Sequence, residues 1–486
     1  MIYENIVVGS GISALGCILG LLENKKQVLC IDSSKNYLDS FNKENNKNVI
    51  FCKQGLPLRK LSEKFVKSKF FNPLEILENS SFGGLSNIWG ANSLRPLKND
   101  FDEWPIGYSD LEKYYEICEE IMNISHFDDK ISSELKIQKN KNGKNKIDFF
   151  SNFIRHFIAQ KRQTNDDFLY GFGRVALNPK CDASSNYFFG CKDDFIFNAK
   201  DHIKKLIEEK KILYRDNLIL KKIVNEKEYI RLVFDNNNVE NIFAKKLFIG
   251  TGSIQTPRIV MNSLSEKKEI TLKESQAFFI PCMYTGKKFN NNPEHHTLTQ
   301  AQVIFKNDDK QKLKNTYYEI KYDEILINSI LKIKFSFLSN LIPKFIKQRL
   351  FVITGFINSK DSIWSAKIKK DNSQIEIVEN KINKKNVKTE ILDQIKILEK
   401  NFNFLSIKFM MKLGNFGRGF HLGASIPMLK QNSQISDLYT NKNGEISKFK
   451  NVFIIDGSNF TNIPASGFSL TIMANALRIA MENLDD

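Results

Sequence analysis

The chain has 486 residues, enough for two or three domains with buried cores, and its 42% hydrophobic and 26% charged residues are typical of a globular protein. Its 72 Lys and Arg against 55 Asp and Glu give a formal net charge of +17. The lysines are spread along the whole chain, however, and no stretch interleaves arginines with aromatic residues as a nucleic-acid groove does, so we expect no nucleic-acid partner.

The seven cysteines form no C-x-x-C pair and are odd in number, which argues against a disulfide framework or a zinc site. The N-terminal apolar segment lacks a basic leader, and the chain has no run of 18 uncharged apolar residues. We therefore expect a cytoplasmic protein with reduced thiols, no membrane span and no bound metal.

Residues 1–32 predict a strand, a glycine turn, a helix and a second strand that ends at an acid. The β-branched run Ile6-Val7-Val8 leads into Gly9-Ser10-Gly11-Ile12-Ser13-Ala14, helical spacing continues to Leu22, and Gln27–Ile31 precedes Asp32. In a dinucleotide site, Gly9 would allow the tight turn, Gly11 would let the backbone approach the pyrophosphate, and Asp32 would accept the ribose hydroxyl. Ser13 and Ala14 would lie in the first helical turn. A plain tight turn in an α/β domain is the alternative.

Two features follow in the next hundred residues. The glycine-rich stretch Phe82–Asn92 would let backbone lie flat against a large planar ligand, although an ordinary glycine loop fits equally well. Ser109 is a plausible N-cap for a helix whose apolar residues recur at helical spacing up to Cys118.

The middle of the chain changes character near residue 263. Before it, Lys246–Gly252 predicts a buried strand that ends in glycines, followed by a helix from Thr256. After it, short strand-like runs alternate with lysine-rich turns, which is typical of an antiparallel sheet. Within this part, Ile325–Ile357 is unusually apolar but is interrupted by basic residues. It would form either a core helix with exposed lysines or a basic amphipathic segment in peripheral contact with a membrane.

The last segment returns to the α/β pattern. Val452–Gly457 predicts a buried strand that ends in an acid, and Leu470–Ala480 predicts a closing amphipathic helix. We therefore expect an α/β fold with a discontinuous Rossmann-like dinucleotide-binding domain (1–110, 199–262 and 414–486) and a mainly antiparallel substrate-binding domain (263–413). Residues 111–198 would be a helical or irregular connection and lid.

Six blocks of the sequence resemble the glucose-methanol-choline family of FAD-dependent oxidoreductases, and they occur in family order. Residues 111–250 and 263–413 carry no specific match. The blocks are Gly9–Ala14, Gly83–Gly90, Trp104–Leu111, Gly252–Pro257, His421–Met428 and Val452–Ala480.

The resemblance implies that the cofactor is FAD, with Asp32 on the adenosine ribose. Some relatives attach FAD through a histidine in the second block, where this chain has Ile88, so the resemblance implies non-covalent FAD. Gly83, Gly84, Ser86 and Asn87 would lie along the flavin, Asp456 and Gly457 would contact the pyrophosphate or ribityl chain, and Thr471 completes the cofactor-binding set.

By the same resemblance, His421 would face the flavin N5 and take the hydroxyl proton while hydride leaves the carbinol carbon. Alcohol oxidation needs a base whose pKa is poised near neutral pH, and histidine is the side chain with that range. The chain has only six histidines, and His421 alone lies in a glycine-framed block near the C-terminal cofactor segment. A structural histidine bonded to a backbone carbonyl is the alternative.

One position departs from the family pattern. Relatives place a second His or Asn shortly before the closing helix, where this chain has Gly467, so His421 would act alone or with Ser466 or Asn462. We expect an FAD-dependent enzyme that oxidises a CH–OH group of a polyol or sugar-like substrate and passes electrons to an unknown acceptor. Redox-neutral sugar isomerisation, or a catalytically degenerate FAD protein at a membrane surface, are the alternatives.

Overall fold

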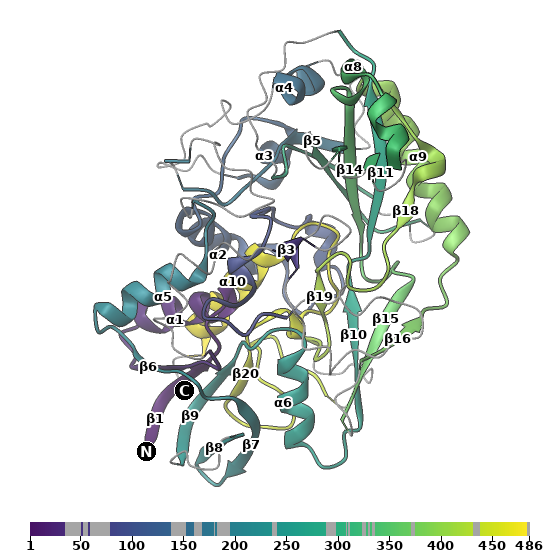
Figure 1. The fold of residues 1–486 in the computed structure, drawn as a ribbon. Coiled ribbons are helices and arrows are strands. Elements are labelled where there is room, and N and C mark those ends of the chain that lie inside the picture. Colours follow the sequence, from purple (N-terminus) through teal and green to yellow (C-terminus); the bar gives the residue numbers. More distant parts are fainter. Residues whose placement is uncertain are drawn as a thin grey trace.

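The computed structural model describes most of the chain and divides it into a helix-covered parallel sheet and a large antiparallel sheet (Figure 1). This arrangement confirms the predicted fold class, a Rossmann-like α/β domain joined to a mainly antiparallel domain. The described residues are 1–34, 50–51, 57–58, 78–137, 152–159, 168–178, 180–181, 195–235, 241–287, 298–307, 309, 312–322, 327–328, 331–332, 336–370, 375–430 and 438–483.

The parallel sheet is assembled from distant parts of the chain. Its parallel strands run in the order β6-β2-β1-β9, with β20 beside the end of β9, while β8 and β7 extend it in antiparallel fashion. Strands buried on both faces read as continuous apolar runs, which is why these segments were recognisable. The strands are β1 (Ile2–Val8), β2 (Val28–Ile31), β6 (Leu213–Arg215), β7 (Leu220–Glu226), β8 (Tyr229–Phe234), β9 (Ile242–Ile249) and β20 (Val452–Ile454).

Helices cover one face of this sheet, and α1 (Ile12–Glu23) and α10 (Ser469–Glu482) pack closely against each other (Figure 1). A Cβ added at Gly16 would lie 2.5 Å from the Met473 carbonyl oxygen. Only a glycine permits this approach, so Gly16 sets the spacing of the two helices. The helix α6 (Gln255–Ser263) packs against β7 and β10. Two further helices are α2 (Tyr108–Ile121) and α5 (Ala199–Glu208).

The large antiparallel sheet has the strand order β17-β11-β14-β13-β12-β5, and β18 also pairs with β11. One face packs on the long helix α9 (Lys384–Asn401), whose buried residues include Ile391 and Ile395. A smaller sheet, β16-β15-β10-β19, packs against the other face of the parallel sheet. The strands are β5 (Phe168–Phe172), β10 (Glu269–Glu274), β11 (Ala277–Tyr284), β12 (Ala301–Phe305), β13 (Thr316–Lys321), β14 (Leu350–Ile357), β15 (Trp364–Lys369), β16 (Ile375–Glu379), β17 (Phe404–Ser406), β18 (Lys412–Leu413) and β19 (Leu422–Gly423).

The remaining described elements are short. No described helix is both long and apolar enough to cross a bilayer. The elements are α3 (Lys130–Leu135), α4 (Asn152–Ala159), α8 (Lys344–Lys347), the two-stranded pair β3 (Ile50–Phe51) and β4 (Pro57–Leu58), and the 3-10 turns η5 (Gly84–Asn87), η6 (Lys98–Phe101), η9 (Ser336–Leu341), η10 (Lys408–Met410) and η11 (Gly457–Asn459).

Three local predictions differ from the structure. The segment Ile325–Ile357 forms no continuous helix where it is described: it contains short turns and then β14, whose alternate residues Phe351 and Ile353 are buried in the sheet. Ser109 was predicted as an N-cap, but α2 begins at Tyr108 with Gly107 as its N-cap, and the Asp110 carboxylate accepts a 2.7 Å hydrogen bond from the Gly107 amide. Residues 111–198, expected to be a connection and lid, also supply strand β5 to the large sheet.

Candidate functional site

The turn between β1 and α1 has the geometry that the glycine pattern predicts. Gly9 has φ +110°, and a Cβ there would lie 2.5 Å from the Gly250 carbonyl oxygen. Gly11 is the N-cap of α1, and an added Cβ would meet no atom within 4 Å. The first turn of α1 contains no acidic residue, and no side chain caps it. Its backbone N–H groups are therefore available to bind an anion. Because no atom lies within 4 Å of a Cβ at Gly11, a ligand can approach these groups there.

Asp32 lies directly after β2, at the same edge of the sheet. Its carboxylate accepts a 2.8 Å hydrogen bond from the Ser34 amide, and its own amide donates to the Arg215 carbonyl. Burial raises the pKa of the Asp32 carboxyl, with hydrogen bonds from Ser34 and Ser10 opposing the rise. An acid held at this edge beside the open helix end is the arrangement that binds a nucleotide ribose.

The glycine-rich segment lies against the first turn. The Gly83 amide donates a 2.9 Å hydrogen bond to the Ser10 hydroxyl, and a Cβ at Gly84 would lie 3.6 Å from the Gly11 Cα. The predicted contacts Ser86 and Asn87 use their side chains internally. Ser86 donates to the Gly83 carbonyl and accepts from the Ala199 amide, and Asn87 donates to the Phe82 carbonyl.

Asp456 joins the turn after β9 to the turn after β20. Its carboxylate accepts hydrogen bonds from the Gly252 amide (2.8 Å), the Thr256 hydroxyl (2.5 Å) and the Ser458 amide (2.9 Å). Burial raises the pKa of Asp456, and these donors oppose the rise. The carboxylate is therefore a structural clamp at the carboxyl edge of the sheet, whatever else it contacts.

The other two predicted residues of this C-terminal segment also make contacts within the protein. The Gly457 carbonyl accepts a 2.8 Å hydrogen bond from the Ala424 amide, which ties the His421 segment to the clamp. Thr471 is buried, and its hydroxyl lies 3.1 Å from the Tyr115 hydroxyl, so it links α10 to α2. Ser13 and Ala14 are buried in the first turn of α1, where the Ser13 hydroxyl lies 3.5 Å from the Gly250 carbonyl.

His421 lies where this edge meets the large antiparallel sheet. Its ring stacks on Phe356 of β14, with centroids 4.8 Å apart, and Phe468 approaches edge-on at 5.0 Å. Nδ1 is buried and has no hydrogen-bond partner among the described residues. Burial lowers the pKa of His421 from 6.5 to about 4, while the charge of Glu319 opposes this shift and that of Lys321 adds to it. The imidazole is therefore neutral at pH 7 and able to accept a proton.

The environments of the other described histidines differ. His126 is buried with Nε2 3.5 Å from the exposed carboxylate of Asp128, and His202 packs its ring on Phe197. The adjacent pair at 295–296 lies outside the described residues. Of the histidines described, His421 is the one joined to the Asp456 and Gly457 segment.

Asn92 lies beside Gly467, the position where the family pattern has a second polar residue. A Cβ added at Gly467 would lie 3.2 Å from the Asn92 carbonyl oxygen and 3.8 Å from its Nδ2 atom. Of the substitutes considered from sequence, Ser466 has a buried hydroxyl without a partner among the described residues, and Asn462 accepts a 3.4 Å hydrogen bond from Asn358. The first atom of a side chain at Gly467 would therefore press on the Asn92 backbone, and the Asn92 side chain lies beside this position.

Asn92 belongs to a polar network that sequence reasoning missed. Asn92 Nδ2 donates to the Tyr317 hydroxyl at 2.7 Å and to the Glu319 carboxylate, and Gln302 Nε2 donates to Asn92 Oδ1 at 2.5 Å. The alternation in Thr316–Lys321 was a usable signal, because residues two apart on a strand share one face.

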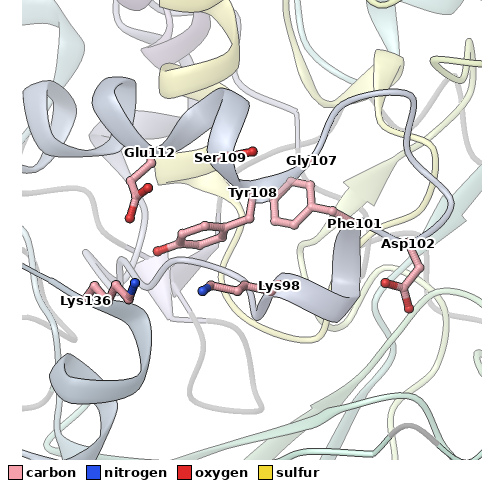
Figure 2. Close-up of a pocket in the computed structure, with 8 residues that line it drawn as sticks. All are labelled: Lys98, Phe101, Asp102, Gly107, Tyr108, Ser109, Glu112 and Lys136. Carbon is pink, nitrogen blue, oxygen red and sulfur yellow. The ribbon is translucent and has the colours of Figure 1, made fainter.

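A separate surface pocket of about 370 Å³ lies beside the start of α2 (Figure 2). Lys98 and Lys136 line it together with Tyr108 and Glu112. Tyr108 donates to the Leu135 carbonyl, and the first turn of α2 is already capped by Asp110. The pocket therefore offers no open helix end and contains neither His421 nor the cradle residues.

Comparisons with known proteins support the fold. No family model and no curated protein matches the sequence. Among solved structures, the chain is similar to pyridoxine 4-oxidase from Mesorbium loti, with a TM-score of 0.62 over 99% of each chain and 12% sequence identity. At this identity the likeness shows the fold alone. The chain thus shares its two-domain fold with this oxidase.

Proposed function

We propose that the protein is a flavin-dependent oxidoreductase that oxidises an alcohol group, with FAD held non-covalently and His421 as the base. The observation that carries the proposal is a neutral His421 imidazole next to a dinucleotide cradle, with a buried Nδ1 that has no hydrogen-bond partner among the described residues. The shared fold with an enzyme named as pyridoxine 4-oxidase supports an oxidoreductase of this kind.

The cradle residues fit a dinucleotide at three points. The open N-terminus of α1 would bind the pyrophosphate through backbone N–H groups, and Asp32 would accept the ribose hydroxyls. Gly83 and Gly84, held against Gly11 by Ser10, present backbone without side chains to a planar ring. Ile88 has no nucleophilic atom, consistent with non-covalent attachment. The bound FAD would supply a two-electron acceptor for hydride.

His421 would remove the proton from the substrate hydroxyl while the carbinol carbon loses hydride. The alcohol then becomes an aldehyde or ketone, the proton resides on the imidazole, and both electrons leave with the hydride. Phe356 and Phe468 pack against the ring and restrict its orientation.

The substrate is proposed to be a polyol or sugar-like alcohol. The sheet face beside His421 carries amide, hydroxyl, carboxylate and ammonium groups, contributed by Asn92, Gln302, Tyr317, Glu319 and Lys321. Such a surface suits a ligand with several hydroxyl groups better than a purely apolar alcohol.

The test is anaerobic reduction of the FAD-loaded protein with sugars, polyols and simple alcohols. We expect bleaching of the flavin absorbance, with one carbonyl product formed per flavin reduced. Product formation without net reduction would instead identify redox-neutral isomerisation. No bleaching and no product with any substrate, in a protein that binds FAD, would contradict the proposal.

A further inference from the structure

One face of β13 is directed toward the candidate site. Tyr317, Glu319 and Lys321 are two residues apart and therefore share a face. In the strand register Tyr317 lies opposite Phe356, the residue whose ring stacks on His421. Glu319 lies opposite Gln302 on the other neighbouring strand, so Gln302 joins the same face.

Glu319 is the centre of the polar part of this face. Its carboxylate accepts from Asn92 Nδ2 and pairs with the Lys321 ammonium at 2.5 Å. The Glu319 side chain is only 6% exposed, whereas that of Lys321 is 28% exposed. A buried carboxylate thus anchors a cation that remains accessible, and the two charges cancel.

Unused hydrogen-bonding atoms remain on this face. A lysine ammonium has three N–H donors, and the contact with Glu319 uses one of those on Lys321. Gln302 Oε1 is a buried acceptor without a partner among the described residues. The face therefore carries a cationic donor at Lys321 and a buried acceptor at Gln302, and the charges of Lys321 and Glu319 cancel.

We propose that Lys321, held by Glu319 and assisted by Gln302, is a specificity-determining residue that binds a second hydroxyl group of the substrate. A hydroxyl both donates and accepts, so it matches a paired donor and acceptor, whereas a carboxylate or phosphate would meet the neighbouring Glu319 charge.

This inference rests on the proposed function for the location of the reacting carbon, but ligand binding tests it without turnover. The experiment measures affinity by calorimetry for cyclohexanol, 1,2-cyclohexanediol, methyl glucopyranoside and cyclohexanecarboxylate. The protein is the FAD-loaded full chain carrying His421→Gln, so that no ligand is oxidised. The expected result is at least tenfold tighter binding of the diol and the sugar than of cyclohexanol.

Adding Lys321→Met should weaken diol and sugar binding at least tenfold and leave cyclohexanol binding unchanged. The double variant Glu319→Gln, Lys321→Met removes both charges and guards against misfolding caused by an unpaired buried carboxylate. It should show the same loss of diol binding. Lys306→Met is the matched control, because Lys306 pairs with Glu134 at 2.7 Å outside this face.

Equal affinity for the diol and the mono-alcohol, including no binding of either, would overturn the inference. So would preferred binding of the carboxylate, or diol affinity that is unaffected by Lys321→Met and by the double variant. Selective diol binding in a protein that oxidises no alcohol would contradict the proposed function and leave the hydroxyl site standing.

Discussion

His421 is the residue whose protonation state the proposed oxidation depends on. Burial lowers its pKa to about 4, so the imidazole remains a competent base well below its ordinary value of 6.5. We expect the rate constant for flavin reduction to be flat from pH 8 to pH 5 and to fall as the imidazole becomes protonated near pH 4. Stopped-flow absorbance measures it, with circular dichroism as the control for folding. A break near pH 6.5 would show that the native imidazole is not shielded.

The neighbouring charges should move this break in opposite directions. The Glu319 charge raises the pKa of His421 and the Lys321 charge lowers it. Glu319→Gln should therefore shift the acid limb to lower pH, and Lys321→Met should shift it to higher pH. Shifts in the same direction, measured on the same reduction trace, would mean that these charges do not act on His421.

For single residues, the sequence predicted where polar side chains lie in the fold better than it predicted which groups they contact. His421 was singled out because only six histidines exist and one lies in a glycine-framed block, and its role as the base remains a prediction. The cofactor roles of Ser86, Asn87, Asp456 and Thr471 remain predictions, and their side chains hydrogen-bond to other parts of the protein. A motif marks where a polar residue lies, but the partner of its side chain depends on distant segments.

At the scale of elements, Gly11 at the N-cap of α1 and Gly16 within α1 have different surroundings and give a matched pair of variants. Gly16→Ala places a Cβ 2.5 Å from the Met473 carbonyl, so it should separate α1 from α10 and destabilise the protein by about 1–3 kcal/mol. Gly11→Ala meets no atom within 4 Å and has extended backbone, so stability without cofactor should not change. FAD affinity should fall instead, because the added methyl lies over the proposed pyrophosphate path.

Urea unfolding and FAD titration of both variants separate packing from ligand approach. Loss of stability in Gly11→Ala, or normal stability in Gly16→Ala, would contradict the roles assigned to these glycines.

The Asp456 clamp predicts a second effect on stability. Asp456→Asn replaces one carboxylate oxygen by an amide nitrogen, which donates hydrogen bonds and cannot accept them. The hydrogen bonds that this oxygen accepts, from Gly252 and Thr256 or from Ser458, are then lost. We expect the free energy of unfolding to fall by about 1–3 kcal/mol. Asp235→Asn is the control, because its ion pair with Lys221 is exposed and such pairs contribute little. Equal effects of the two substitutions on the urea midpoint would contradict the clamp.

Elements with strong local periodicity were predictable, and those decided by tertiary contacts were not. The turn after β1 follows from glycine spacing within thirty residues. By contrast, Ile325–Ile357 shows apolar residues and lysines that suit a helix locally, yet β14 forms there because it pairs with β11 and β13 on both sides. Strand β5 was missed for the same reason, since its partner β12 lies more than 100 residues away.

At the scale of the whole molecule, one exposed apolar surface allows a test of the alternative that residues 325–357 contact a membrane. Leu341 and Phe345 are 74% and 61% exposed, with Lys344 and Lys347 in the same short helix as Phe345. If this surface binds anionic lipid, the protein should sediment with phosphatidylserine vesicles at low salt but not with phosphatidylcholine vesicles. Phe345→Ser with Lys344→Glu should abolish that association. Unchanged sedimentation in the variant would exclude this surface.

The discontinuous architecture was predictable from the first, middle and last strands because each is a buried apolar run that ends in glycine or acid. The alternation in β13 indicated the face that carries Glu319, but it could not predict the contact with Asn92, which lies more than 200 residues from both Gln302 and Glu319 in the chain. The fold was therefore more accessible to sequence reasoning than the substrate face.

The central claim is alcohol oxidation with His421 as the base, and one measurement tests it most directly. FAD-loaded wild-type protein and His421→Gln are mixed anaerobically with the most effective alcohol of the panel, and the rate of flavin bleaching is recorded. The account predicts retained FAD and a loss of about 10²–10⁴-fold in rate for the variant. Equal rates in the two proteins would contradict it.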